Sequence, residues 1–256
     1  MNTELKQMAE TMKLVVRMGA ELIKARTLAG EQKKKGAFDY VTAVDVKVQE
    51  FIRERLKESY PQVDFLGEEQ TEYHLDSQEL WILDPIDGTT NFIHDYRCSA
   101  ISLAYAQKGE ILIGVIYQPY ADELFYGIKG EGAYCNEIPI HVSGTDCMEE
   151  SLIAVGTSPY HKEMASENFA LFQKLFLQCM DIRRSGSAAV DLAWVACGRC
   201  DAYLERKLKI WDYAAGLLIL KEAGGRMTDF EGEDPGIMLE RDVVAANGKI
   251  EIGKYL

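Results

Sequence analysis

Residues 81–92 read WILDPIDGTTNF, and this stretch decides how the rest of the chain is interpreted. The apolar run before Asp84 predicts a β-strand that delivers this carboxylate to its carboxyl end. Pro85 is expected to end the strand pairing because it has no amide hydrogen to donate. Asp87-Gly88 then predicts a turn toward a helix that starts at Thr89-Thr90. The sequence therefore places two carboxylates, three residues apart, at a strand-to-helix turn.

These two carboxylates are expected to hold a cation, because neighbouring negative charges repel each other in a dry site. At the start of the following helix, the free amides of Gly88, Thr89 and Thr90 predict an anion site beside the cation. Adjacent cation and phosphate sites are what metal-assisted phosphoryl hydrolysis requires. Standing alone, the motif is equally consistent with a surface turn, because Asp and Gly are ordinary turn residues.

Three further acidic positions lie at the ends of predicted elements. Glu68 follows an apolar strand, Asp212 opens an apolar helix, and Asp45 lies in the first turn of another helix. Two of them have a structural alternative, because Asp212 could be an N-cap and Thr42 with Asp45 fits a capping box. Together with the 84–87 pair, they predict a cluster of carboxylates that binds metal.

The spacing of the two aspartates also bears on the reaction class. Phosphatases that form an aspartyl-phosphate use D-x-D-G-T, in which a period of two puts both aspartates on one side of a strand end. Here the spacing is three, and Pro85 lies between the two aspartates. Neither aspartate is placed as a nucleophile with a neighbouring acid, so the sequence favours water as the nucleophile.

Outward from this stretch, the first half of the chain predicts an α+β arrangement. Apolar residues recur at helical spacing over 4–27 and in a second helix that begins near Thr42 and stops before Pro61. The polar segment Gly30–Asp39 predicts a mobile loop. Strands are expected at 63–66, 80–83, 100–106, 111–117 and 123–128, with Lys108-Gly109-Glu110 as a hairpin turn.

The second half predicts an α/β layer, because strands and helices alternate along it. Strands are expected at 152–155, 180–184 and 201–205, and helices near 161–178, 187–197 and 212–223. A break in the pattern near 142–150 predicts two halves. Residues 1–145 form an α+β half with the metal-binding signature, and residues 146–256 form an α/β half with substrate residues and the last metal ligand.

Composition excludes several classes of function. The chain has 256 residues and a net charge of −13, with 41 acidic against 28 basic residues, which argues against nonspecific binding of nucleic acid. No apolar run is long enough for a membrane span. The N-terminus shows no signal peptide, so the six cysteines are expected to be free thiols in the cytoplasm.

At this point the chain resembles the inositol monophosphatase family. DPIDGTTNF is similar to the central signature of that family, and WDYAAGLLILKEAGG resembles its C-terminal one. The segments GEE, VTAVD and RSGSAAVDLAWVACGRCDAYLE match as well, in the expected order over nearly the whole chain. The resemblance implies a layered αβαβα sandwich, a homodimer, inhibition by lithium, and two to three Mg²⁺ ions, with Mn²⁺ as an alternative.

The resemblance also implies a set of metal ligands. Glu68, Asp84 and the backbone carbonyl of Ile86 would hold one ion, and Asp84, Asp87 and Asp212 a second. Glu68 would also bind a weaker third ion, which makes this residue part of the catalytic set.

Catalysis and substrate binding are implied for further residues. Asp45 would accept a hydrogen bond from Thr89, and this pair would orient the attacking water. The residues implied in substrate binding are Asp87, Gly88, Thr89, Thr90, Thr157, Gly186, Ser187, Ala188, Glu205 and Asp212. For Glu205, an exposed charge at a strand end is an equal alternative.

The resemblance favours hydrolysis of inositol 1-phosphate and leaves other substrates open. Relatives also act on fructose 1,6-bisphosphate, NADP(H) and adenosine 3′,5′-bisphosphate, and some bacterial relatives bind transcription machinery, so a regulatory protein-binding role is a further alternative. The short stretch between Glu69 and Trp81 and the Asp95–Cys98 segment depart from the animal pattern and are expected to reshape the pocket rim. The Lys33–Lys35 run either reaches a metal or phosphate or is a solvated charge run.

Overall fold

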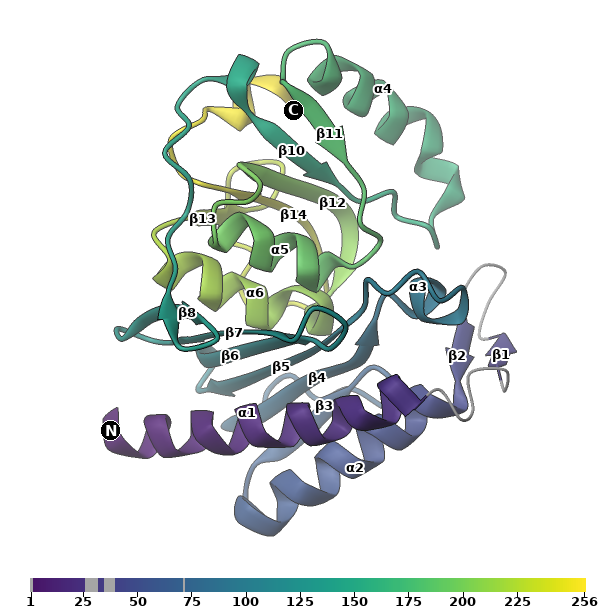
Figure 1. Ribbon diagram of the computed structural model, residues 1–256, viewed down its shortest axis with the longest axis vertical. Helices are drawn as coiled ribbons and strands as arrows, with labels where there is room; N and C mark the ends of the chain where they lie inside the picture. The colour runs from purple at the N-terminus through teal and green to yellow at the C-terminus, as the bar shows by residue number, and fades with distance from the viewer. Residues whose placement is uncertain (1, 26–31, 35–39, 71) are drawn as a thin grey trace.

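The computed structural model describes residues 2–25, 32–34, 40–70 and 72–256, and its elements stack in five layers (Figure 1). From one side to the other these are a helix pair, a seven-stranded sheet, a second helix pair, a five-stranded sheet and a single helix. Three hydrophobic clusters fill the spaces between these layers. The predicted αβαβα sandwich is therefore confirmed.

The outer helix pair consists of α1 (Asn2–Ala25) and α2 (Ala43–Ser59). Its apolar stripes pack on the first sheet, as the helical periodicity predicts. The end of the expected helix 4–27 lies outside the described residues. Within the expected 30–39 loop, β1 (Gln32–Lys34) pairs antiparallel with β2 (Tyr40–Thr42), so the loop prediction is wrong there. The rest of that loop, and the side chains of the Lys33–Lys35 run, lie outside what the structure describes.

The seven-stranded sheet has the order β3-β4-β5-β6-β7-β8-β9, and only the β3–β4 pairing is parallel. Its strands are β3 (Asp64–Gly67), β4 (Glu79–Asp87), β5 (Ala100–Gln107), β6 (Glu110–Gln118), β7 (Glu123–Ile128), β8 (Gly132–Cys135) and β9 (Ile138–Pro139). Lys108 and Gly109 form the predicted hairpin turn, both with positive φ. The period of two is visible in β4, because Leu80 and Ile82 face the central helices whereas Trp81 and Leu83 face α1 and α2.

Strand β4 differs from its prediction at the site that matters most. Pro85 was expected to end the strand, but β4 continues to Asp87, and its register against β5 shifts between Asp84 and Asp87. A β-bulge tolerates proline because the extra residue does not need to donate a ladder hydrogen bond. The bulge therefore carries both aspartates within one strand rather than ending the strand at the first.

The five-stranded sheet has the order β11-β10-β12-β14-β13. Its strands are β10 (Leu152–Val155), β11 (Asp181–Arg183), β12 (Ala202–Lys209), β13 (Arg226–Thr228) and β14 (Glu240–Ala246). Strands β10, β11 and β12 are parallel, as the alternating pattern predicts, and β14 adds antiparallel pairs. The sequence did not predict β8, β9, β13 or β14. The division into halves at residue 145 stays a prediction.

Two helices, α5 (Ala188–Ala196) and α6 (Ile210–Glu222), lie between the sheets, and α4 (Ala165–Phe176) covers the outer face (Figure 1). Because both faces of the central pair are covered, α5 and α6 are apolar nearly all round. Their close approach to the first sheet requires Gly114, where an added Cβ would lie 2.4 Å from the carbonyl oxygen of Ala215. Among the described helices, none is long and apolar enough to cross a membrane.

Candidate active site

A cavity of about 930 Å³ opens where the ends of β4, β12, α5 and α6 meet. Its size lies within the range of roughly 300–1,000 Å³ that is typical of small-molecule sites. All candidate site residues except Asp45 line this cavity, although they are spread over most of the chain. The lining candidates are Glu68, Asp84, Ile86, Asp87, Gly88, Thr89, Thr90, Thr157, Gly186, Ser187, Ala188, Glu205 and Asp212.

The centre of the site is a triad of carboxylates. Asp84, Asp87 and Asp212 each offer a carboxylate oxygen, and these oxygens all lie within 4.8 Å of one another. The bulge in β4 supplies the first two. Asp212 is the third residue of α6 and accepts a hydrogen bond from the amide of Lys209 at 2.8 Å, so it closes the first turn of α6 without being the N-cap itself.

The electrostatics of this triad are those of a cation site. Burial raises the pKa of Asp84 well above its ordinary value, and the charges of Glu68, Asp87 and Asp212 raise it further. Burial likewise raises the pKa of Asp87 to about 6, and burial and the Asp87 charge raise the pKa of Asp212. Among the described residues, no lysine or arginine forms an ion pair with any of the three. The oxygen-only donor set therefore fits a divalent cation such as Mg²⁺.

Glu68 approaches the triad from a second segment. It directly follows β3, and its amide donates to the carbonyl of Leu83 at 3.1 Å, which fixes this loop beside β4. The carboxylate of Glu68 lines the same cavity and raises the pKa of both Asp84 and Asp212. The carbonyl oxygen of Ile86 accepts a hydrogen bond from the Thr89 hydroxyl at 3.0 Å.

Asp45 lies behind the cavity wall rather than in the lining. Its Oδ2 accepts from the amide of Thr42 at 2.8 Å and from the Thr42 hydroxyl, and Thr42 in turn caps α2, so the alternative of a capping box is confirmed. Its Oδ1 accepts from the Thr89 hydroxyl at 3.2 Å. The buried carboxylate of Asp45 thus belongs to the capping box of α2 and also accepts the hydrogen bond from Thr89. Burial raises the pKa of Asp45 despite the hydrogen bonds from Thr42 and Thr89.

Gly88 makes the turn between the strand and the helix α3 (Thr89–Ile93). It adopts a left-handed conformation with φ of 88°, and an added Cβ would lie 3.0 Å from the carbonyl oxygen of Cys98. Only glycine suits this combination of backbone angle and close contact. The first-turn amides of Thr89 and Thr90 have no partner inside the helix, as at any helix start, and both residues line the cavity.

The opposite wall is built from α5 and β12. Ser187 caps α5 and donates its hydroxyl to Oδ2 of Asp87 at 2.6 Å, and the amide of Ala189 donates to the same oxygen at 2.6 Å. These two bonds fix the rotamer of Asp87. The Thr157 hydroxyl accepts a weak bond from Arg184 at 3.5 Å.

Glu205 is not the exposed strand-end charge that the alternative interpretation predicts. It is only 9% exposed, because the period of two in β12 turns it, like Tyr203, toward the central helices. The hydroxyl of Tyr203 donates to Oε2 at 2.6 Å and the amide of Ser158 to Oε1 at 2.7 Å. Burial raises the pKa of Glu205.

Several lining residues were not among the candidates. Asp191 is buried, and its Oδ1 has no hydrogen-bond partner among the described residues. Arg184, Lys207 and Lys209 line the rim, and His161, which carries no motif, lines it as well. In the sequence these lysines are marked only by the basic run ERKLK, which ends one residue before the C-terminal signature.

The segment between Glu69 and Trp81 contributes to the cavity wall, and the expected change in the shape of the rim stays a prediction. Tyr73 from this segment lies against Trp211, with ring centroids 5.3 Å apart, and both rings line the cavity. The segment thereby forms part of the cavity wall.

Comparisons with known proteins agree with this geometry. A sequence profile described as the inositol monophosphatase family matches residues 3–256. An Inositol-1-monophosphatase of Rhizobium meliloti is 41% identical over 199 residues, 77% of this chain and 75% of that protein. The Nus factor SuhB of Escherichia coli (strain K12) is 39% identical over 223 residues, 87% and 83% of the two chains. The solved structure of inositol monophosphatase from Anabaena (Nostoc) sp. PCC 7120 has a TM-score of 0.87 at 33% identity and covers 98% of this chain and 94% of that one. This chain therefore belongs to the inositol monophosphatase family.

Proposed function

We propose that the protein hydrolyses small phosphate monoesters in a Mg²⁺-dependent reaction with water as the nucleophile. The observation that carries this proposal is the buried triad of Asp84, Asp87 and Asp212, whose oxygens lie within 4.8 Å of one another. Without a cation, three such carboxylates are mutually repulsive. A protein that retains them in a cavity gains from their charge only when a divalent ion is bound.

The ligands would be Glu68, Asp84, Asp87, Asp212 and the carbonyl of Ile86, and they would hold two to three ions. Bound Mg²⁺ would supply Lewis-acid stabilisation of phosphoryl charge and a more acidic water. The chain itself orients these ligands. Ser187 and Ala189 fix Asp87, as described above, so that its other oxygen can face the triad.

Thr89 and Asp45 would position the nucleophile. The Thr89 hydroxyl has one hydrogen to donate and two acceptors nearby, Asp45 Oδ1 and the carbonyl of Ile86. Because both are acceptors, the lone pairs of Thr89 are available to accept a hydrogen bond from water. The backbone amides that begin α3 would bind a phosphate oxygen on the same side of the cavity.

Inositol 1-phosphate is the first substrate to test, because the family and the R. meliloti relative carry that name. Fructose 1,6-bisphosphate, NADP(H) and adenosine 3′,5′-bisphosphate remain alternative substrates. A comparison of kcat/KM across these four compounds would identify the substrate class.

Phosphate release is expected to require the metal. In Mg²⁺ the protein should turn over at least one of the four substrates. Addition of EDTA should lower the activity to below about one part in a thousand, because the metal would supply the preorganised stabilisation of phosphoryl charge. Mn²⁺ should restore activity in part, and Li⁺ should inhibit it. Equal rates of phosphate release in Mg²⁺ and in EDTA would reject the metal assignment.

Stability should report metal binding independently of turnover. Mg²⁺ at about a hundred times its Kd is expected to raise Tm by about 5–10 °C near pH ~8. Burial raises the pKa of Asp87 from 3.8 to about 6, so between these values the native state binds more protons than the unfolded chain. The free energy of unfolding of the metal-free protein should therefore fall as pH rises through this window.

Protons and metal compete for the same carboxylates, so the increment in Tm caused by Mg²⁺ should shrink as pH falls to about 5. Thermal melts in Mg²⁺ and in EDTA at both pH values measure this difference. An increment that grows toward low pH would contradict the proposed ligands.

We propose a homodimer in the cytoplasm as the working state. The surface that suits self-association is the outer helix α4 with the turn after it. Its exposed apolar side chains include Phe169, Phe176, Leu177 and Met180, of which Leu177 is 70% exposed. Clustered apolar exposure of this kind is typical of protein interfaces.

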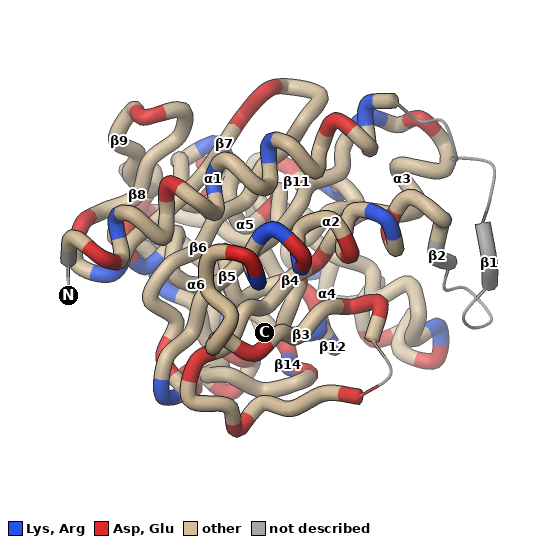
Figure 2. Tube along the Cα trace, turned by 90° about the horizontal axis from the view of Figure 1, so that it is seen from below, with Lys and Arg blue, Asp and Glu red and all other residues tan. Residues whose placement is uncertain are grey.

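A regulatory protein-binding role is the second candidate, because the E. coli relative carries the name Nus factor SuhB. On the α1–α2 face, basic and acidic residues alternate rather than gather into a basic stripe (Figure 2). That distribution supports the prediction that nucleic acid is not a direct partner. A pull-down with Asp84→Asn protein separates the two functions, because only a binding role would survive this substitution.

A further inference from the structure

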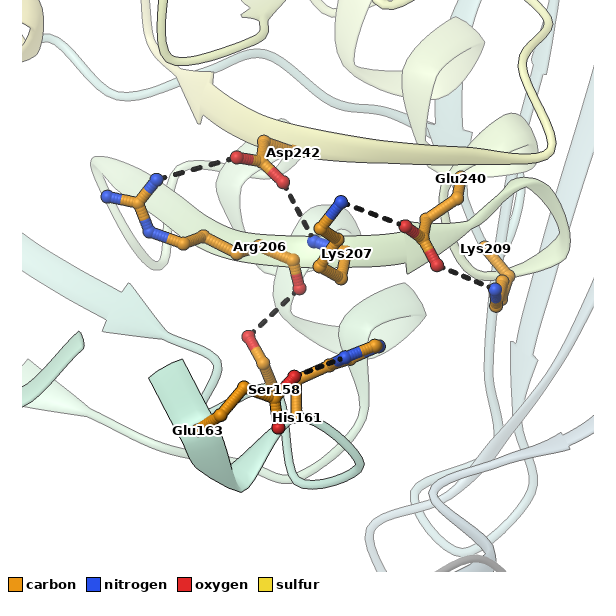
Figure 3. A network of polar contacts seen from close by, with 8 residues as sticks. All are labelled: Ser158, His161, Glu163, Arg206, Lys207, Lys209, Glu240 and Asp242. Carbon is orange, nitrogen blue, oxygen red and sulfur yellow. Dashed lines mark hydrogen bonds and ion pairs between the residues drawn. The ribbon is translucent and has the colours of Figure 1, made fainter. Parts of the chain in front are cut away.

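A cluster of cations forms part of the cavity rim, where β12 bulges against β14 (Figure 3). The register of β12 against β14 shifts between Glu205 and Leu208, which lets residues 206 and 207 project from the strand. Lys207 and Lys209 both extend toward Glu240, with nitrogen–oxygen distances of 3.1 and 2.7 Å. Each lysine side chain remains about two-fifths exposed.

The lysine pair belongs to a larger network of ion pairs. Two ammonium groups share the single carboxylate of Glu240, whose pKa lies below its ordinary value, because the bonds from Lys209 and Lys207 outweigh burial. The neighbouring Arg206 contributes no free charge, since it pairs with Glu167 at 2.9 Å and Asp242 at 3.4 Å. Three cations and three carboxylates therefore balance within this network, and the lysines offer exposed ammonium groups rather than a net charge.

Arg184 supplies a positive charge that this network does not balance, and its charge opposes the rise in the pKa of the nearby Asp87, Asp191 and Glu205. It lines the cavity and forms no ion pair with the described carboxylates. Its guanidinium lies 3.5 Å from the Thr157 hydroxyl, and the next residue, Ser158, donates its hydroxyl to the carbonyl of Arg206 at 2.9 Å. This short chain of contacts connects Arg184 to the bulge of β12.

The backbone of Lys207 is strained to keep this arrangement. Its φ is 61°, in the left-handed region, which is unfavourable for a non-glycine residue. The amide of Lys207 donates to Oδ1 of Asp242 at 3.0 Å, which holds the conformation. Strained residues that are held by their surroundings concentrate at functional sites. Glycine would be the unstrained choice here, yet the chain has a lysine.

We propose that this rim, made of Arg184, Lys207 and Lys209, binds a second phosphate group of the substrate, away from the phosphate that is hydrolysed. This inference rests on the proposed phosphatase function and specifies its substrate class as bisphosphorylated compounds. Guanidinium and ammonium groups are the usual protein partners of phosphate. A neutral polyol ring would offer no anion to these guanidinium and ammonium groups.

The test uses two pairs of substrates that differ only in the second phosphate. One pair is fructose 1-phosphate and fructose 1,6-bisphosphate, and the other is adenosine 3′-phosphate and adenosine 3′,5′-bisphosphate. The wild-type protein should favour the bisphosphate of at least one pair by about tenfold or more in kcat/KM, chiefly through KM. The preferred pair shows whether a sugar or a nucleoside bears the two phosphates of the substrate.

Two variants test the residues. Lys207→Gln combined with Lys209→Gln should lower the ratio of kcat/KM between bisphosphate and monophosphate by about tenfold. Lys207→Gly should lower the same ratio and raise Tm, because glycine relieves the left-handed strain. Lys57→Gln, an exposed lysine on α2, is the matched control and should keep the ratio of the wild type.

The outcomes separate this inference from the proposed function. Failure to hydrolyse these four compounds and inositol 1-phosphate in Mg²⁺ would overturn the phosphatase itself, whereas hydrolysis of inositol 1-phosphate alone would overturn only the second phosphate site. Hydrolysis without preference for either bisphosphate, or a preference that both rim variants retain, would overturn the second phosphate site and leave the phosphatase standing.

Discussion

Asp84→Asn is expected to lower kcat/KM for phosphate release by roughly a thousandfold while it raises the stability of the metal-free protein. Asp84 would be shared by two metal ions, so its loss affects the whole site. Asparagine has nearly the same shape and can still accept the hydrogen bond that the amide of Ile86 donates to Asp84 Oδ1 at 2.9 Å. Loss of activity would therefore not reflect loss of the fold.

The gain in stability follows from the charges around Asp84. Burial and the carboxylates of Glu68, Asp87 and Asp212 all oppose ionisation of Asp84, which is why its pKa is raised. A neutral side chain removes this repulsion, so Tm in EDTA should rise by at least about 2 °C near pH ~8. The increase in Tm that Mg²⁺ causes in the wild type should disappear.

The control for this prediction is Asp64→Asn, at the start of β3 on the exposed surface. It removes the same charge from the chain and should leave kcat/KM and the Mg²⁺ effect on Tm unchanged. An Asp84→Asn protein that melts lower than wild type in EDTA, or that retains the Mg²⁺ effect, would show that Asp84 is an ordinary structural residue.

The sequence predicted the carboxylate cluster because its members lie at or near the ends of elements, with Asp84 three residues before the end of β4. Strand periodicity before Asp84 and helix periodicity after Asp212 are local signals, and local signals are what a single sequence contains. The strand end at Pro85 was predicted wrongly because a bulge depends on the partner strand β5, which the local pattern does not specify.

The burial of residues between the layers was harder to predict. Glu205 and Asp191 are buried only because central helices lie between two sheets, so their surroundings come from distant parts of the chain. Strands β8 and β13 are short, and pairing with β7 and β14 defines them more than their own sequence does. The place of Lys207 on the cavity rim could not be predicted either, because nothing in the local sequence indicates its left-handed backbone.

Thr89→Val is expected to reduce kcat by about a hundredfold to a thousandfold, because it removes the hydroxyl that would orient water. Valine keeps the volume and the β-branch of threonine, so the packing around this 8%-exposed side chain should persist. Thr89→Ser retains the hydroxyl and should stay within about tenfold of the wild type. Comparison of kcat for the three proteins measures the contribution of the hydroxyl alone.

A second substitution tests whether the Thr89–Asp45 bond has a purely structural role. Thr42→Val removes the other hydroxyl that bonds Asp45 and also removes the cap of α2, which should cost about 0.5–2 kcal/mol of stability. Thr89→Val leaves Asp45 Oδ1 without its Thr89 partner and should cost a similar amount, about 1–3 kcal/mol. If the two variants lose stability alike but only Thr89→Val loses kcat, the hydroxyl acts on the reaction. If kcat falls equally in both, Thr89 acts only by holding Asp45 in place.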